Sequence, residues 1–275
     1  MPDLGSRIVL YHAIRSARQL GLSYAKMQRK LFEDTGIRLS KASISYWLRG
    51  IHDPSGSLNR FHPDPSPELS YEIGVALSDG KINVHDYHGE ILLSVTDKDF
   101  ASEFGRCLGR VLGRGEPYKV RWSEKRARWI VQGSTILLHK FLNCNWFNLR
   151  KWIEHCAKCE SAFLRAFYDD EGSICGKSLT IYNTNREMLL YIQDLLWHAD
   201  IGTTQLHLNT KAGTRLIDSK NGRTYIRRKN CYALHVRARS LPRFAESIGF
   251  TIEENKSDFS RRVGSHNGEG GPAGN

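Results

Sequence analysis

The chain has 275 residues and carries 40 Lys+Arg against 29 Asp+Glu, a net charge of +11. Its hydrophobic and charged fractions, 40% and 25%, exclude a disordered chain and allow one large or two smaller domains. Without an apolar run of 18 residues or a signal peptide, we expect a cytoplasmic protein that binds no membrane. The positive charge favours nucleic acid as the partner.

Residues 1–50 predict three helices, which we interpret as a helix-turn-helix domain. An apolar stripe from Ile8 stops near Gly21, and Ser23 can cap a second helix. A turn containing Gly36 follows, and Ser40 can cap the third helix, which Gly50 ends. Short helices with a glycine-bearing turn before the last are typical of DNA-binding helix-turn-helix units. A bundle used only for packing or partner binding is the alternative.

The third helix has two chemically different sides. Ile44, Trp47 and Leu48 form its core face. The residues left outside can meet phosphates and base edges, and these DNA-binding candidates are Lys41, Ser43, Ser45, Tyr46 and Arg49.

Residues 51–68 hold four of the eight prolines and predict a linker, and residues 264–275 predict a disordered glycine-rich tail. The chain between them looks duplicated, with one half at 69–155 and another at 156–263. Each half reads as helix, two strands, helix, two strands, helix, which makes the expected fold class α+β with paired αββαββα halves. The predicted strand segments are 81–87, 89–95, 118–122, 128–132, 178–183, 205–209 and 231–239.

Alternation along these strands separates a core face from an outer face. Tyr118, Val120, Trp122, Leu206, Leu208, Leu234, Val236 and Ala238 are expected to face the core. The outer side chains are basic or amide-bearing and rarely acidic, as a surface that reads DNA requires. These candidates are Lys119, Arg121, Gln205, His207, Asn209, His235, Arg237 and Arg239.

The stretches EIGVALSDG (72–80) and LRAFYDDEG (164–172) share one outline. Gly74 and Ala166 occupy the same place in the two copies, and small residues there let two helices approach closely. Asp79 and Glu171, 92 residues apart, close the two copies. If the helices run parallel, two carboxylates meet at the negative ends of two helix dipoles, where a cation relieves their repulsion.

The two stretches resemble the twin motifs of LAGLIDADG homing endonucleases in the single-chain form. The resemblance covers residues 69 to about 256 and implies a monomer whose two sheets form a pseudo-twofold saddle on double-stranded DNA. It implies Mg²⁺-dependent, site-specific cleavage of a long, partly palindromic target, and an origin in intron homing. Asp79 and Glu171 would then be catalytic metal ligands, assisted by the backbone carbonyls of Ser78 and Asp170. A basic residue near the scissile phosphate would be Lys98, with Lys81 and Lys177 as other candidates.

Two alternatives use the same scaffold. A DNA-binding transcriptional regulator would keep the basic sheets and lose the acids, and the presence of both acids argues against it. A maturase would bind intron RNA, and a preference for folded RNA over duplex DNA would distinguish it.

The stretch HCAKC (155–159) contains His155, Cys156 and Cys159, with Cys144 upstream. Because no second ligand pair at zinc spacing accompanies it, we expect these cysteines to be packing thiols in a reducing compartment.

Overall fold

A computed structural model describes residues 4–52, 54, 61–78, 81–85, 88–175, 178–217, 222–253, 255–257 and 259. Two separate hydrophobic cores hold the described residues. The smaller core is formed within the first 48 residues, and the larger core extends from Phe61 to Phe259. None of the described helices is long and apolar enough to cross a membrane.

The N-terminal unit contains α1 (Leu4–Gln19), α2 (Tyr24–Thr35) and α3 (Lys41–Leu48). The predicted caps are confirmed, because the hydroxyl of Ser23 accepts from the backbone N–H of Lys26 and that of Ser40 from Ser43. Gly36 adopts the left-handed conformation that ends α2, at φ 69°. Leu10, Ile14, Ala17, Met27, Leu31, Leu39, Ile44 and Trp47 form the core of this unit.

The first half of the larger part follows the predicted order of elements. Its elements are α4 (Pro67–Leu77), β1 (Lys81–His85), β2 (His88–Val95), α5 (Lys98–Val111), β3 (Arg121–Ser123), β4 (Arg128–Ser134) and α6 (Ile136–Leu142). The four strands form an antiparallel sheet in the order β1-β2-β4-β3. A 3-10 helix (Trp146–Leu149) and the short α7 (Arg150–Ile153) lead into the second half.

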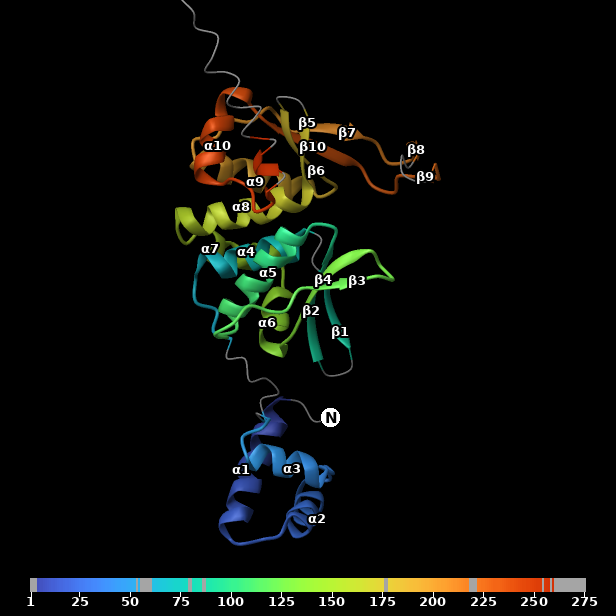
Figure 1. The fold of residues 1–275 in the computed structure, drawn as a ribbon. Coiled ribbons are helices and arrows are strands. Elements are labelled where there is room, and N and C mark those ends of the chain that lie inside the picture. The colour runs from blue at the N-terminus through green and yellow to red at the C-terminus, as the bar shows by residue number, and fades with distance from the viewer. Residues whose placement is uncertain are drawn as a thin grey trace, which may run out of the picture.

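The second half repeats this topology (Figure 1). Its elements are α8 (Ala157–Glu171), β5 (Gly172–Cys175), β6 (Ser178–Asn183), α9 (Arg186–His198), β7 (His207–Thr210), β10 (Cys231–Val236), a 3-10 helix (Ala238–Ser240) and α10 (Leu241–Ser247). The order β5-β6-β10-β7 matches that of the first sheet position for position. The predicted duplicated α+β fold is therefore confirmed.

Several strand bounds differ from the prediction. The segment 118–122 is strand only from Arg121, and the segment 231–239 stops being strand after Val236. Strand β5 and the two-stranded ribbon of β8 (Arg215–Ile217) and β9 (Thr224–Ile226) were not predicted. Short strands carry too few residues for alternation to be recognised.

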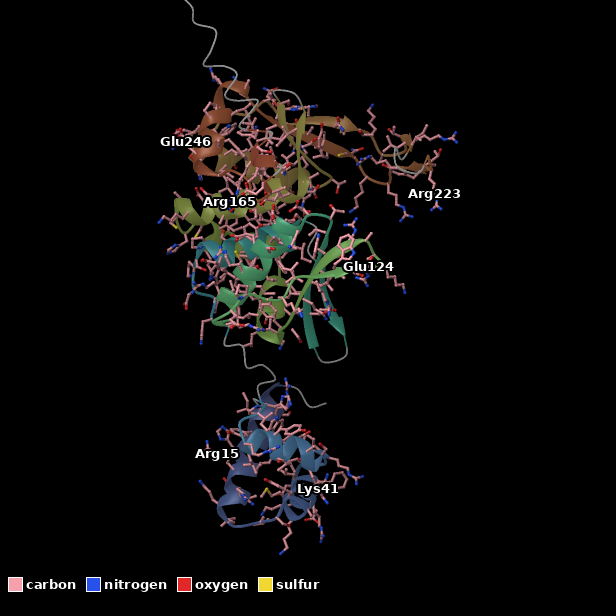
Figure 2. The ribbon with its side chains drawn as sticks, viewed as in Figure 1. Arg15, Lys41, Glu124, Arg165, Arg223 and Glu246 are labelled. Atoms are coloured by element: carbon pink, nitrogen blue, oxygen red, sulfur yellow. The ribbon has the colours of Figure 1, made fainter. Side chains whose placement is uncertain are left out.

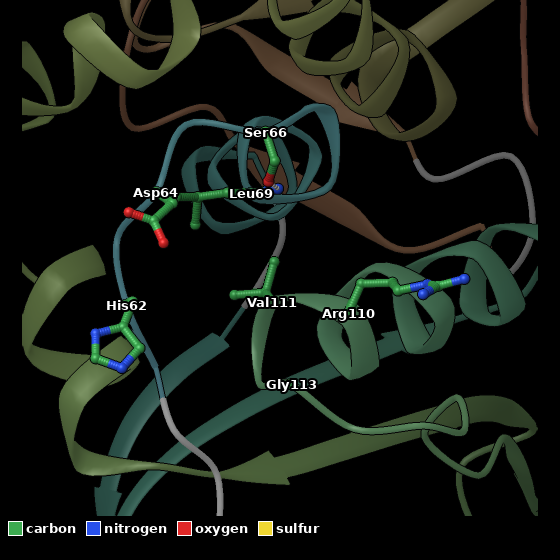
Figure 3. A pocket seen from close by; sticks show the side chains of 7 residues that line it. All are labelled: His62, Asp64, Ser66, Leu69, Arg110, Val111 and Gly113. Atoms are coloured by element: carbon green, nitrogen blue, oxygen red, sulfur yellow. Dashed lines mark hydrogen bonds between the residues drawn. The ribbon is translucent and has the colours of Figure 1, made fainter.

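The end of the predicted linker belongs to the first half. Ser66 caps α4, which begins at Pro67, and Phe61 is buried against Phe141 with ring centroids 5.2 Å apart. This segment and the end of α5 enclose a hollow lined by His62, Asp64, Ser66, Leu69, Arg110, Val111 and Gly113 (Figure 3). The predicted tail, 264–275, lies outside the described residues.

Candidate active site and nucleic-acid interface

Helices α4 and α8 run parallel and side by side through the centre of the larger core. The hydroxyl of Ser70 donates to the carbonyl of Cys159 at 2.7 Å. One turn further along both helices, Gly74 faces Phe163 and Ala166. Because the residue numbers of α4 and α8 both increase in the same direction along the contact, the C-terminal ends of the two helices lie at the same end of the pair.

Gly74 sets how closely the two helices approach. A Cβ atom added there would lie 2.8 Å from the Cβ of Ala166 and 2.9 Å from the carbonyl oxygen of Phe163. Carbon atoms in ordinary contact are about 3.5–4.0 Å apart, so any larger residue would push the helices apart. The expectation that Gly74 and Ala166 let the two motif helices pack closely is confirmed.

Of the two predicted acids, the structure describes Glu171, which lies at the common end of the helix pair. Asp79 lies outside the described residues, two positions after the end of α4. The preceding residue, Ser78, caps α4, and its hydroxyl donates to the carbonyl of Val75 at 3.2 Å. Glu171, the last residue of α8, is half-buried, and its Oε1 accepts a hydrogen bond of 3.2 Å from the amide of Asn183 on β6. The carboxylate is thus oriented by the neighbouring strand.

Gly172 lets the chain pass directly from α8 into β5. A Cβ at this position would lie 2.2 Å from the carbonyl oxygen of Tyr168. Only glycine fits so close to the last turn of the helix. The glycine of the second motif therefore fixes where Glu171 stands relative to the sheet.

The three consecutive acids at the end of α8 have different environments. Asp169 is buried, and its carboxylate accepts from the backbone N–H of Thr251 at 2.8 Å. Burial raises the pKa of Asp169 to about 6. Asp170, whose backbone carbonyl is expected to assist in binding the metal, is half-buried like Glu171. Asp169 therefore holds the C-terminal segment, and only the last two acids reach solvent.

The predicted lysines are distributed over different elements. Lys98 is exposed at the start of α5, and its ammonium lies 5.3 Å from the ring centroid of Trp129 on β4, a cation–π contact. Lys81 begins β1, and Lys177 lies outside the described residues.

The first sheet presents a polar outer face on β3 and β4. Arg121 is exposed and donates to the amide oxygen of Gln132 at 2.5 Å. Arg128, which the strand pattern did not single out, donates to the carbonyl of Ser94 at 3.1 Å. Lys119 is exposed just before β3. Tyr118 and Val120 pack against the core as expected, but Trp122 is 42% exposed because it lies on β3, a three-residue strand at the edge of the sheet.

The second sheet has a polar outer face with two stacked imidazoles. The rings of His207 and His235 lie 5.0 Å apart and nearly parallel. His235 Nδ1 lies 2.6 Å from the hydroxyl of Thr180, and burial lowers the pKa of His235, so this ring stays neutral at pH 7. Gln205 and Asn209 are exposed. This face therefore offers hydrogen-bonding groups rather than positive charge.

Two predictions for this sheet were wrong in detail. Arg239 lies in the 3-10 helix after β10 and not on the sheet, because the strand ends at Val236. Ala238, expected in the core, is exposed for the same reason, and Leu208 is 40% exposed on the edge strand β7. Arg237 is exposed, but its Nε donates to the carbonyl of Thr203 at 2.8 Å.

The β8–β9 ribbon extends the second half on the side where the β3–β4 hairpin extends the first (Figure 1). Figure 2 places Glu124, in the β3–β4 turn, and Arg223, beside the ribbon, on this same side. The ribbon is rich in exposed basic and apolar side chains, namely Arg215, Ile217, Arg223, Tyr225, Ile226, Arg228 and Lys229. Alternation around the Asn-Gly pair at 221–222 is the sequence signal that could have revealed it.

In the N-terminal unit, α3 shows the predicted division. Ile44 and Trp47 are buried, whereas Lys41, Tyr46 and Arg49 are exposed. Ser43 and Ser45 are half-buried, and the hydroxyls of Ser40 and Ser43 lie 2.9 Å apart.

The HCAKC segment differs from the prediction of packing thiols. Cys159 is buried, but Cys156 and His155 are exposed. The hydrogen bond with His155 is the main cause that lowers the pKa of Cys156 to about 7, while burial raises that of Cys159 to about 12.

Comparisons with known proteins agree with this architecture. Residues 158–249 match the model of the LAGLIDADG-like domain. The chain is 29% identical to the uncharacterized protein MJ0398 of Methanocaldococcus jannaschii over 90% of each chain, and 27% identical to the uncharacterized protein MJ0314 of that organism over 58% of this chain and 62% of that protein. The crystal structure of I-DmoI in complex with DNA and Ca has the same fold, with a TM-score of 0.50 at 14% identity, covering 71% of this chain and 97% of that chain. Residues 158–249 therefore resemble a LAGLIDADG-like domain, and the duplicated fold is the fold of I-DmoI.

Proposed function

We propose that the protein is a metal-dependent, site-specific endonuclease that acts as a monomer on double-stranded DNA. The parallel packing of α4 and α8 at Gly74 carries this proposal, because it directs the chain from both motif helices to one place. Asp79 follows α4 by two residues and Glu171 ends α8.

The residues at this place suit a hard divalent cation. Carboxylate and carbonyl oxygens are the ligands that Mg²⁺ and Ca²⁺ take, and both helices direct the negative ends of their dipoles here. Asp79 and Glu171 would hold the ion, with the carbonyls of Ser78 and Asp170 as further donors. When bound, the ion lowers the pKa of an attacking water and stabilises the departing 3′ oxygen.

The protein's own groups hold and orient this arrangement. Asn183 donates a hydrogen bond to one oxygen of Glu171 and so orients this carboxylate. In this proposal Lys98 contacts the phosphate backbone from the start of α5, where its ammonium is exposed beside Trp129.

The outer faces of the two sheets would bind the duplex on either side of the cut. Arg121, Arg128 and Lys119 supply positive charge on the first sheet, and the ribbon supplies it for the second. His207, Asn209 and Gln205 offer donors and acceptors for base edges. The exposed side of α3 would add contacts outside the saddle in the manner of a recognition helix.

A cleavage selection from a random duplex library with Mg²⁺ tests the proposal. We expect the wild-type protein and the control Glu246→Gln, whose side chain is 72% exposed, to enrich one long cut site. Asp79→Asn and Glu171→Gln should bind that site with nearly unchanged affinity and yield no cut product.

Two other results would contradict the proposal. Specific duplex binding without cleavage at any Mg²⁺ or Mn²⁺ concentration would indicate a regulator on this fold. Tighter binding of folded intron RNA than of any selected duplex would indicate a maturase.

A further inference from the structure

A second cluster of metal-ligating side chains lies at the opposite end of α8 from Glu171. The ligand atoms of His155, Cys156 and Cys159 all lie within 4.8 Å of one another. Cys156 precedes the first residue of α8, and 15 residues of helix separate it from Glu171, about 22 Å at 1.5 Å per residue. The two sites are therefore independent.

The geometry fits one tetrahedral ion. The two sulfur atoms lie 3.5 Å apart, and two thiolates on one Zn²⁺ at about 2.3 Å each stand about 3.8 Å apart. The sulfurs need to move only by a few tenths of an ångström. Among the described residues, no other Cys, His, Asp or Glu joins the group, so three protein ligands leave one position. His155 and Cys156 are exposed, so water can fill that position.

We propose that His155, Cys156 and Cys159 bind one Zn²⁺ ion. Two thiolates and an imidazole are soft or borderline ligands that select Zn²⁺ over Mg²⁺. With three ligands instead of four, the ion exchanges and a chelator removes it. The alternative reading of this cluster is a pair of cysteines that forms a disulfide. A disulfide would need only Cys156 and Cys159, whereas a metal site also uses His155.

The ion would fasten the junction between the two halves. Residues 154–156 connect α7 to α8, and the carbonyl of Cys159 accepts the hydrogen bond from Ser70 of α4. A bond from His155 to the first turn of α8 closes this junction next to the α4–α8 contact. Zn²⁺ should therefore raise the thermal stability of the whole larger core, since a ligand that binds only the folded state stabilises it.

Titration of the fully reduced protein with Co²⁺, and competition by Zn²⁺, tests the site. We expect one equivalent of Co²⁺ with a thiolate-to-metal charge-transfer absorption, displaced by one equivalent of Zn²⁺, and a higher melting temperature with Zn²⁺. Cys156→Ser should remove the absorption and the thermal shift, and His155→Asn should lower the affinity at least about tenfold.

Cys144→Ser is the matched control, because Cys144 is an exposed cysteine outside the cluster. It should leave the titration unchanged. Cys156 and His155 are exposed, so their variants should fold, and circular dichroism checks this. Absence of the absorption in the reduced wild type would overturn the proposal, as would an absorption that survives Cys156→Ser.

Discussion

Glu72 is a buried carboxyl group at the first position of the first motif. It is 0% exposed on α4, and neither of its oxygens has a hydrogen-bond partner among the described residues. Burial raises the pKa of Glu72 well above its usual range, Glu103 raises it further, and Arg106 opposes the shift. The folded protein therefore holds this side chain protonated, whereas the unfolded chain ionises it near pH 4.5.

This difference makes folding stability depend on pH with a defined sign. Below about pH 4.5 Glu72 is protonated in both the folded and the unfolded chain, so its ionisation does not change the free energy of unfolding. As the pH rises, ionisation favours the unfolded chain by about 1.4 kcal/mol per pH unit until the folded carboxyl ionises as well. Glu72→Gln abolishes this pH dependence while keeping the shape of the side chain.

Urea unfolding of the full chain at pH 5, 6 and 7 measures the effect. Tryptophan fluorescence is a suitable signal, because five of the six tryptophans lie outside the small N-terminal core. Relative to wild type, Glu72→Gln should gain stability as the pH rises across this range, by at most about 1.4 kcal/mol per pH unit, and the exposed control Glu246→Gln should show no such trend. A stability difference that stays constant from pH 5 to 7 would refute the reasoning.

Three further predictions concern the helix pair, the site and the DNA face. Gly74→Ala places a Cβ 2.8 Å from that of Ala166. Calorimetry should show a loss of stability of about 1–3 kcal/mol from overpacking, reduced by about 1 kcal/mol because alanine favours a helix more than glycine does. Adding Ala166→Gly should partly restore the stability of this variant, and strictly additive effects of the two substitutions would contradict the contact. Asn183→Ala should lower the cleavage rate about two- to tenfold, because one hydrogen bond to Glu171 is lost. It should also raise the Mg²⁺ concentration needed for half-maximal rate. An unchanged dependence on Mg²⁺ would show that Asn183 does not orient this carboxylate. Arg121→Ala should lower the slope of log affinity against log salt by about 1, whereas Arg243→Ala, on α10, should not; equal slopes for the two variants would place the duplex elsewhere.

Local sequence signals predicted most of the secondary structure. Ser23 and Ser40 were predicted to cap helices because a short polar side chain before an apolar stripe satisfies free backbone N–H groups, and both cap helices in the structure. The duplication was visible because each half repeats the same order of helical and strand periodicities. The end of β10 and the start of β3 were misjudged because alternating polar and apolar residues extend beyond the residues that pair with a neighbouring strand.

Contacts between distant residues decided the rest. The sequence by itself determined that small residues occupy equivalent places in two motifs, and hence that a close helix pair was possible. Only the tertiary structure decided that α4 and α8 run parallel, that Asn183 reaches Glu171, and that Glu72 is buried with no hydrogen-bond partner in the part of the chain that the structure describes. The tertiary structure also placed the ligand atoms of His155, Cys156 and Cys159 close together. A sequence search that requires four ligands at zinc spacing does not find this cluster. The physical reason is that periodicity and capping act within about four residues along the chain, whereas the distance between side chains on different elements depends on how the whole core packs.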